Sequence, residues 1–426
     1  MIQNYGKNLD EDEYRGPSFV PSYNLSVIPS LLPSISHPLA NDPSLYPSFS
    51  PSSFPSSCLS LHPTDFPDTF ADVEIEGHKD LCGDTTNVSL KNKFNLTLMG
   101  TAKWYLGMKI TQQKDHITLD QDQYVKNITT RFEKLFKHPF KLKDSPLPAS
   151  FVPTKKDSPS TDAEIKEIKT RFGNLNFRSI IGALLYVSCC TRPDISYAVN
   201  KLAKYANNPG ATHFRALLHL IGFLKANSNK GLKFYNDISK SELYKVLQEN
   251  NIEIKQDTNV VFTDSSWNDC VDTGRSTGGY VALSQAGPVD YGSHLPVPVA
   301  MSSGEAEYIA AAVACMRASH IRMLIYDLRC LGSKDYNSDE LTCEPSRIIV
   351  DNEAAIAMAK CNKDTAGNRH VARRYHYVRQ GSTLKEHIFE WISTKYQLAD
   401  PLTKPGTIGT FGFLWSLLLT EIGNEN

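Results

Sequence analysis

Apolar and polar positions in the second half of the chain repeat at the spacing of strands and helices. Val260–Phe262 is an apolar, β-branched run that leads to Asp264, a pattern typical of a buried strand. Tyr280–Leu283 and Val299–Met301 are predicted to be further strands, and Gly274–Gly279 has the residues of a turn. This part of the chain is therefore predicted to begin with a sheet.

A long helix is predicted next, over residues 306–331. Ser302 and Ser303 can cap its N-terminus. The residues expected on its buried face recur at helical spacing; they are Ile309, Val313, Met316, His320 and Leu324. The pattern then predicts a strand over residues 347–350, a short helix over 353–360, a strand over 387–393 and a last helical piece from Gln397.

Acidic residues fall where these elements begin or end. Asp264 and Asp351 follow buried strands, Glu305 or Glu307 lies in the first turn of the long helix, and Asp400 opens the last helical piece. Carboxylates that converge from such elements repel one another, and bound divalent cations are the usual remedy. The same acids also suit helix caps and turns, so the argument rests on their order along the chain.

Five sequence blocks occur in one order along this half of the chain. They are Thr263–Trp267, Arg275–Tyr280, Ser302–Tyr308, Val350–Ile356 and Gln397–Pro405. Together they resemble the ribonuclease H domain of Ty1/copia-type retrotransposon Pol polyproteins. The resemblance implies an α/β fold with a ribonuclease H-like mixed sheet over residues 256–405. It also implies that Asp264, Glu305, Asp351 and Asp400 are catalytic and metal-binding, with Glu305 preferred to Glu307 because it directly precedes Ala-Glu-Tyr.

The activity that the resemblance implies is hydrolysis of the RNA strand of an RNA–DNA hybrid. Two Mg²⁺ ions, or Mn²⁺ as a substitute, would activate water and stabilise the departing oxygen. Ser265 and Ser266 are candidates to bind ribose or phosphate. The basic residues expected to contact the hybrid are Arg369, Arg373, Arg374 and Arg379; the same segment also suits a surface helix that packs on the sheet. Nearby histidines such as His387 are interpreted as structural.

The chain upstream resembles other parts of the same polyproteins. Residues 88–150 resemble the end of a reverse-transcriptase palm and thumb, and 160–250 resemble the helical connection region. Apolar residues in the connection region are expected to form helix cores, while Lys201, Lys204, Arg215 and Lys225 leave a nucleic-acid groove open as the alternative. No Tyr-x-Asp-Asp turn occurs, so polymerase activity is not expected. Other Pol domains are expected partners.

Composition narrows the setting of the protein. The chain has 426 residues, a formal net charge of −1 and nine scattered cysteines without a Cys-x-x-Cys pair. A reducing compartment is therefore expected, cytoplasmic (in a retroelement particle) or nuclear, without secretion or a membrane. Residues 1–72 are rich in serine and proline and are predicted to be disordered, and 406–426 are predicted to be a tail.

Two other functions compete with the nuclease. A catalytically inactive remnant could keep the fold as a nucleic-acid-binding or interaction module, which a missing polymerase core favours and the preserved acids oppose. A transposase or resolvase on the same fold needs a different spacing of acids and has no support in the sequence.

Overall fold

The structure is a computed structural model that describes residues 101–148, 151–173, 175–255, 258–332, 344–360 and 372–422, without the side chains of 329–332 and 372–375. All of these residues belong to one of the two compact units of the chain, Leu61–Asn426. The predictions for residues 1–72 and for Arg369 lie outside the described ranges, as do those for the side chains of Arg373 and Arg374.

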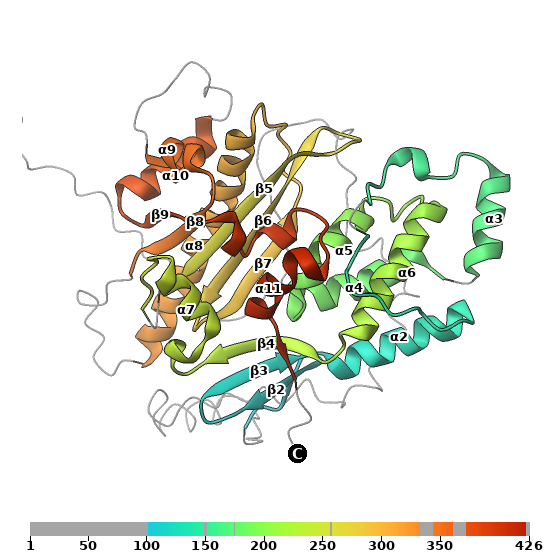
Figure 1. The fold of residues 1–426 in the computed structure, drawn as a ribbon, viewed down its shortest axis with the longest axis horizontal. Helices are drawn as coiled ribbons and strands as arrows, with labels where there is room; N and C mark the ends of the chain where they lie inside the picture. The colour runs from blue at the N-terminus through green and yellow to red at the C-terminus, as the bar shows by residue number, and fades with distance from the viewer. Residues whose placement is uncertain are drawn as a thin grey trace, which may run out of the picture. The chain divides into compact units, whose positions relative to one another are not determined.

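One sheet combines strands from three distant segments of the chain (Figure 1). Its order is β1 (Trp104–Tyr105), β2 (Met108–Gln112), β3 (His116–Asp120), β4 (Lys230–Tyr235) and β10 (Thr420–Glu421), with each neighbouring pair antiparallel. A short turn around residues 113–115 joins β2 to β3. The segment expected to be a C-terminal tail instead contains α11 (Ile408–Leu418) and β10.

A helical region lies beside this sheet and is built on an apolar core, as the sequence predicts. Its helices are α2 (Asp122–Phe136), α3 (Asp162–Phe172), α4 (Phe177–Cys190), α5 (Ser196–Ala203) and α6 (Ala211–Ala226). Leu184, Leu217 and Leu220 are wholly inaccessible to solvent in the core. Arg192 is buried as well, because its guanidinium pairs with the Asp194 carboxylate and Nη1 donates to the carbonyl oxygen of Asn227.

The second sheet is mixed and holds the acidic residues. Its order is β7 (Gly287–His294), β6 (Arg275–Ser284), β5 (Val260–Cys270), β8 (Ser346–Val350) and β9 (His387–Trp391). The first three strands are antiparallel neighbours, and β5, β8 and β9 run parallel. Two details of the sequence prediction are wrong. The third strand is Gly287–His294 rather than Val299–Met301, which directly follows Pro298. Most of the predicted turn Gly274–Gly279 belongs to β6.

Each face of the mixed sheet is covered, as the alternation of its side chains requires. Val261, Ile348 and Val350 pack against α8 (Ser303–Gly332), α9 (Glu353–Lys360) and α10 (Ala372–Thr383). On the opposite face, Phe262 and Ile349 join a cluster that includes residues of α7 (Glu242–Glu249) and α11. A three-layer α/β arrangement results.

The predicted helix at 306–331 is confirmed as α8, but its buried face differs from the one expected. Met316 and Leu324 are 50% and 51% exposed, while a run of alanines that includes Ala310, Ala314 and Ala318 is buried. Among the described helices, α8 is long and apolar enough between Ser303 and Leu328 to cross a membrane, which was not expected from the sequence. Half of its most apolar stretch is buried within the protein. That burial is typical of a core helix.

Candidate active site

Parallel pairing of β5 with β8 brings two acidic residues to one edge of the sheet. The ladder between the strands includes Phe262 opposite Ile349. Asp264 lies two residues beyond this pair on β5, and Asp351 lies two residues beyond it after β8. Residues at the same distance along parallel strands share an edge, so the strand order alone places these carboxylates together.

Glu307 of α8 completes a compact cluster of three carboxylates. One oxygen from each of Asp264, Glu307 and Asp351 lies within 4.8 Å of the others. Asp264 and Glu307 are buried at 4% and 6% exposure. The cluster therefore contains the residue that the sequence analysis held as the alternative.

Glu305, the preferred residue from the sequence, has a different role in the structure. Its Oε2 accepts a hydrogen bond from the Met301 amide at 2.7 Å, and its own amide donates to Ser302 Oγ at 3.2 Å. This reciprocal arrangement caps the N-terminus of α8. Two residues span about 200° around a helix, so only one of these glutamates can face the strands.

Asp400 joins the cluster from a short 3₁₀ helix, η9 (Asp400–Leu402). Burial, together with the nearby Asp264 carboxylate, raises the pKa of Asp400 to about 7. The Lys404 ammonium forms an ion pair with Asp400 Oδ1. The structure thus brings together Asp264, Asp351 and Asp400 as predicted, with Glu307 as the fourth acid.

The charges in the cluster favour a bound cation. Burial, and then the charges of Asp264 and Asp351, raise the pKa of Glu307 to about 10. Burial likewise raises the pKa of Asp351. Glu307 Oε2 is buried and has no hydrogen-bond partner among the described residues. Carboxylate oxygens are the ligands that Mg²⁺ and Mn²⁺ prefer, so this donor set fits a divalent metal.

Curated proteins are similar in sequence to most of this chain. The retrovirus-related Pol polyprotein of transposon TNT 1-94 from Nicotiana tabacum is 27% identical over 319 residues, which cover 74% of this chain and 21% of that protein. The corresponding polyprotein of transposon RE1 from Arabidopsis thaliana is 26% identical over 341 residues, 78% of this chain and 20% of that protein. This chain is similar to transposon Pol polyproteins over about three quarters of its length. It spans about a fifth of the length of these Pol relatives.

Shorter parts of the chain are similar to other proteins. A stretch of 145 residues is 31% identical to the secreted RxLR effector protein 161 of Plasmopara viticola and covers 34% of this chain and 90% of that protein. No protein-family model matches. Among solved structures, the N-terminal RNase H domain of Rv2228c from Mycobacterium tuberculosis aligns with 34% of this chain and 90% of that chain, at 11% identity and a TM-score of 0.25. The region that the sequence blocks predict to be a ribonuclease H-like domain contains the mixed sheet and the acidic edge described above.

Residues of the Pol-related chain that orient the acids were not singled out from the sequence. Thr394 Oγ1 donates to Asp351 Oδ2 at 2.8 Å, and Thr403 Oγ1 donates to Asp264 Oδ2. Gln397 is wholly buried, and its Nε2 donates to the carbonyl oxygen of Thr263 at 3.0 Å. Two of the three lie in the last block of the resemblance, so their positions, though not their roles, were visible in the sequence.

Some of the residues predicted to contact nucleic acid are near the acidic cluster, whereas Arg379 is buried between two helices. Ser265 and Ser266 are half-buried on β5 directly beside Asp264. Arg379 is buried at 7% exposure, and its Nε donates to the Met358 carbonyl oxygen at 3.4 Å. This arginine therefore joins α10 to α9, and its position does not support the predicted contact with a phosphate backbone.

Proposed function

We propose that the ribonuclease H-like domain hydrolyses the RNA strand of RNA–DNA hybrids. The observation that carries the proposal is the convergence of Asp264, Glu307 and Asp351 within 4.8 Å, on the sheet edge that Asp400 also reaches. Four acids from separate elements gathered at one point are costly for the fold unless a cation is bound. The ordered sequence blocks and the transposon Pol relatives support the choice of substrate.

The chain's own residues hold and orient the reacting groups. Asp264, Glu307, Asp351 and Asp400 would bind two Mg²⁺ ions, with Mn²⁺ as a substitute. When bound, such ions polarise a water and stabilise the charge of the leaving oxygen. Thr394 and Thr403 fix one oxygen each of Asp351 and Asp264, so the free oxygens keep their direction.

Lys404 contributes a positive charge to the same site. Burial by itself would lower the pKa of Lys404, but contact with Asp400 and the charges of Asp264 and Asp351 outweigh it, and the pKa is raised. The Lys404 ammonium therefore stays charged and balances part of the negative charge of the acidic cluster when no cation is bound.

Substrate contacts are proposed on the exposed side of this edge. Ser265 and Ser266, which are half-buried beside Asp264 on β5, are the proposed contacts to ribose or phosphate. Selection of a hybrid over a DNA duplex would depend on helix shape and 2′-hydroxyl contacts rather than on base sequence. Polymerisation is no part of the proposal, since the printed sequence contains no Tyr-x-Asp-Asp turn. Other Pol domains remain proposed partners, and a retroelement particle or the nucleus the proposed setting.

The proposal is tested with the purified full chain, a hybrid labelled on its RNA strand, and Mg²⁺ or Mn²⁺. Wild-type protein should cut the RNA strand, and Asp264→Asn should reduce the rate at least about a hundredfold because a metal ligand loses its charge. Asp162→Asn, at an exposed position in α3, is the matched control and should cut normally.

The inactive remnant gives a different result in the same experiment. It would bind the hybrid in a mobility-shift assay but leave the RNA strand intact with either metal. Binding without cutting would overturn the nuclease.

A further inference from the structure

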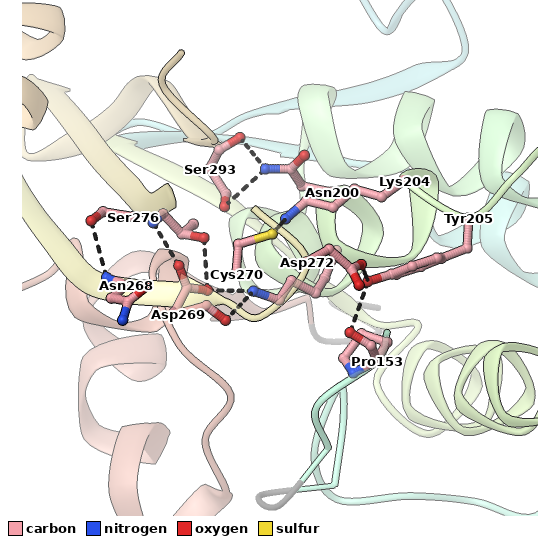
Figure 2. A network of polar contacts seen from close by, with 12 residues as sticks. Pro153, Asn200, Lys204, Tyr205, Asn268, Asp269, Cys270, Asp272, Ser276 and Ser293 are labelled. Atoms are coloured by element: carbon pink, nitrogen blue, oxygen red, sulfur yellow. Dashed lines mark hydrogen bonds and ion pairs between the residues drawn. The ribbon is translucent and has the colours of Figure 1, made fainter. Parts of the chain in front are cut away.

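The helical region contacts the tip of the hairpin formed by β5 and β6, just beyond Asp264. Figure 2 shows contacts that come from α5 and the segment that follows it, and a further contact comes from η4 (Lys155–Asp157). In the neighbouring strand β7, the carbonyl oxygen of Ser293 accepts a hydrogen bond from Asn200 Nδ2 at 2.9 Å. Tyr205 Oη lies 3.0 Å from Asp272 Oδ2, and the Lys155 amide donates to Asp272 Oδ1 at 3.0 Å. The hairpin is thus held from outside its own sheet.

The hairpin tip lacks a regular ladder and depends on side chains for its pairing. The register between β5 and β6 shifts between Ser266 and Cys270, and Asn268 has a φ of 55°. The Asp269 carboxylate takes over the pairing, because it accepts hydrogen bonds from the Thr277 amide at 2.7 Å and from Thr277 Oγ1 at 2.8 Å (Figure 2). Asp269 is therefore the residue that fixes the tip.

Lys201 of α5 supplies the counter-charge for Asp269. Its Nζ forms an ion pair with Asp269 Oδ2, and the two side chains are only 6% and 13% exposed. A carboxylate at this depth that lost its partner would be strongly disfavoured, and the pairing to Thr277 would be lost or rearranged. The charge on α5 and the geometry of the β5 tip are consequently linked.

The tip is continuous with the active-site strand. Asp264 pairs with Gly279, Ser266 pairs with Thr277, and Asp269 bonds the same Thr277. A change at the tip therefore reaches Asp264 along one ladder, with a single residue pair, Ser265 and Gly278, in between. Catalytic carboxylates lose activity when they are displaced by as little as about 1 Å.

We infer that Lys201 is a positioning residue: α5 holds the β5–β6 hairpin through Asp269 and so keeps Asp264 in place for the proposed nuclease reaction. Only the cleavage kinetics in its test depend on the proposed function; hydrogen exchange at the hairpin does not. By this inference the helical region supports the active-site strand, and Lys201 does not line a groove for nucleic acid.

The test compares Lys201→Met, Lys201→Arg and Tyr205→Phe in the full chain with wild-type protein. Lys225→Met is the matched control, because it breaks an ion pair of the same region, with Glu133, away from the hairpin. Hydrogen exchange of residues 264–277 should be about tenfold faster in Lys201→Met and unchanged in Lys225→Met. For hybrid cleavage, kcat should fall about ten- to a hundredfold in Lys201→Met with KM unchanged, and Lys201→Arg should restore part of it.

The outcomes separate the inference from the proposed function. Wild-type protein that cuts no hybrid contradicts the function, while exchange at the hairpin still decides whether Lys201 holds it. Unchanged exchange in Lys201→Met overturns the inference even if the enzyme is active. A rise in KM without a fall in kcat would show Lys201 in substrate binding and would overturn it as well. If Lys201→Met does not fold, Tyr205→Phe, which loses the bond to Asp272, must show faster exchange at the hairpin, or the inference fails.

Discussion

Two glutamates in one helix turn illustrate what single residues contribute. Glu307 faces the strand acids and has an unpartnered buried oxygen, whereas Glu305 caps α8 through Met301. Glu307→Gln should abolish metal-dependent cleavage without lowering the melting temperature in metal-free buffer, since the Glu307 carboxyl, with its pKa raised to about 10, is already neutral there. Glu305→Ala should destabilise the protein by about 1 kcal/mol through loss of the cap. Thermal melts and cleavage assays of both variants check this; cleavage by Glu307→Gln but not by Glu305→Ala would reverse the assignment.

The sequence could locate three of the four acids but not choose between these glutamates. Asp264, Asp351 and Asp400 stand at ends of elements, where the pattern of apolar residues marks their positions. Glu305 and Glu307 both lie in the first turns of one helix. Which of them faces the strands depends on the rotation of α8 against the sheet, and that is set by tertiary packing of alanines with no strong periodic signal.

His387 makes stability depend on pH. Burial, and then the charge of Arg322, lower the pKa of His387 to about 4, although Glu386 acts in the opposite direction. The unfolded chain takes up a proton as pH falls through about 6.5, while the folded state stays neutral to about 4, so stability is lost as pH falls through this window. From pH 7 to pH 5 this residue should cost about 2 kcal/mol.

Urea unfolding of wild-type protein and His387→Gln at both pH values measures this contribution. The variant should lose about 2 kcal/mol less between pH 7 and pH 5 than wild-type protein does. Equal losses in the two proteins would show that the buried imidazole is not the source.

At the scale of elements, close packing between η9 and β6 positions Asp400. A Cβ added to Gly279 would lie 2.9 Å from Leu402 Cβ and 3.0 Å from the Ala399 carbonyl oxygen. Gly279→Ala should therefore displace η9 and reduce cleavage at least about tenfold. Gly278→Ala is the control, because its nearest neighbour is the His294 ring, a side chain able to move. Cleavage rates measured side by side check the pair, and equal rates would contradict the packing argument.

The elements show where sequence patterns fail and why. Val260–Phe262 and Ile348–Val350 are apolar on both faces of the sheet, so β5 and β8 were predictable. Strand β7 begins with Gly287-Pro288 and carries few apolar residues, because it is an edge strand with half-buried side chains. The pairing of β7 with β6 is a tertiary contact, so no local sequence pattern predicts it. The predicted core of the helical region is confirmed, since its apolar residues follow helical spacing closely.

On the scale of the whole molecule, the ribonuclease H-like domain shares its core with residues beyond it. Leu414, Trp415 and Leu418 of α11 pack in the same cluster as Phe262 and Ile349 of the mixed sheet. Removal of residues 406–426 should therefore lower the free energy of unfolding by several kcal/mol. Urea unfolding of the shortened and full chains measures the loss, with removal of residues 1–60, which lie outside the unit that contains both sheets, as the control. Equal stability of the shortened and full chains would show that the predicted boundary at 405 is the true one.

The pairing of β10 with β4 has a consequence for how the protein is made. Thr420 is opposite Gly231, and nearly the whole ribonuclease H-like domain lies between them in the sequence. Because a chain leaves the ribosome from its N-terminus, β2, β3 and β4 emerge long before the strand that covers the edge of β4. That edge stays open to other strands throughout the intervening synthesis, and a pairing across so long a loop forms slowly. Newborn chains are thus exposed to mispairing with one another until translation reaches Thr420.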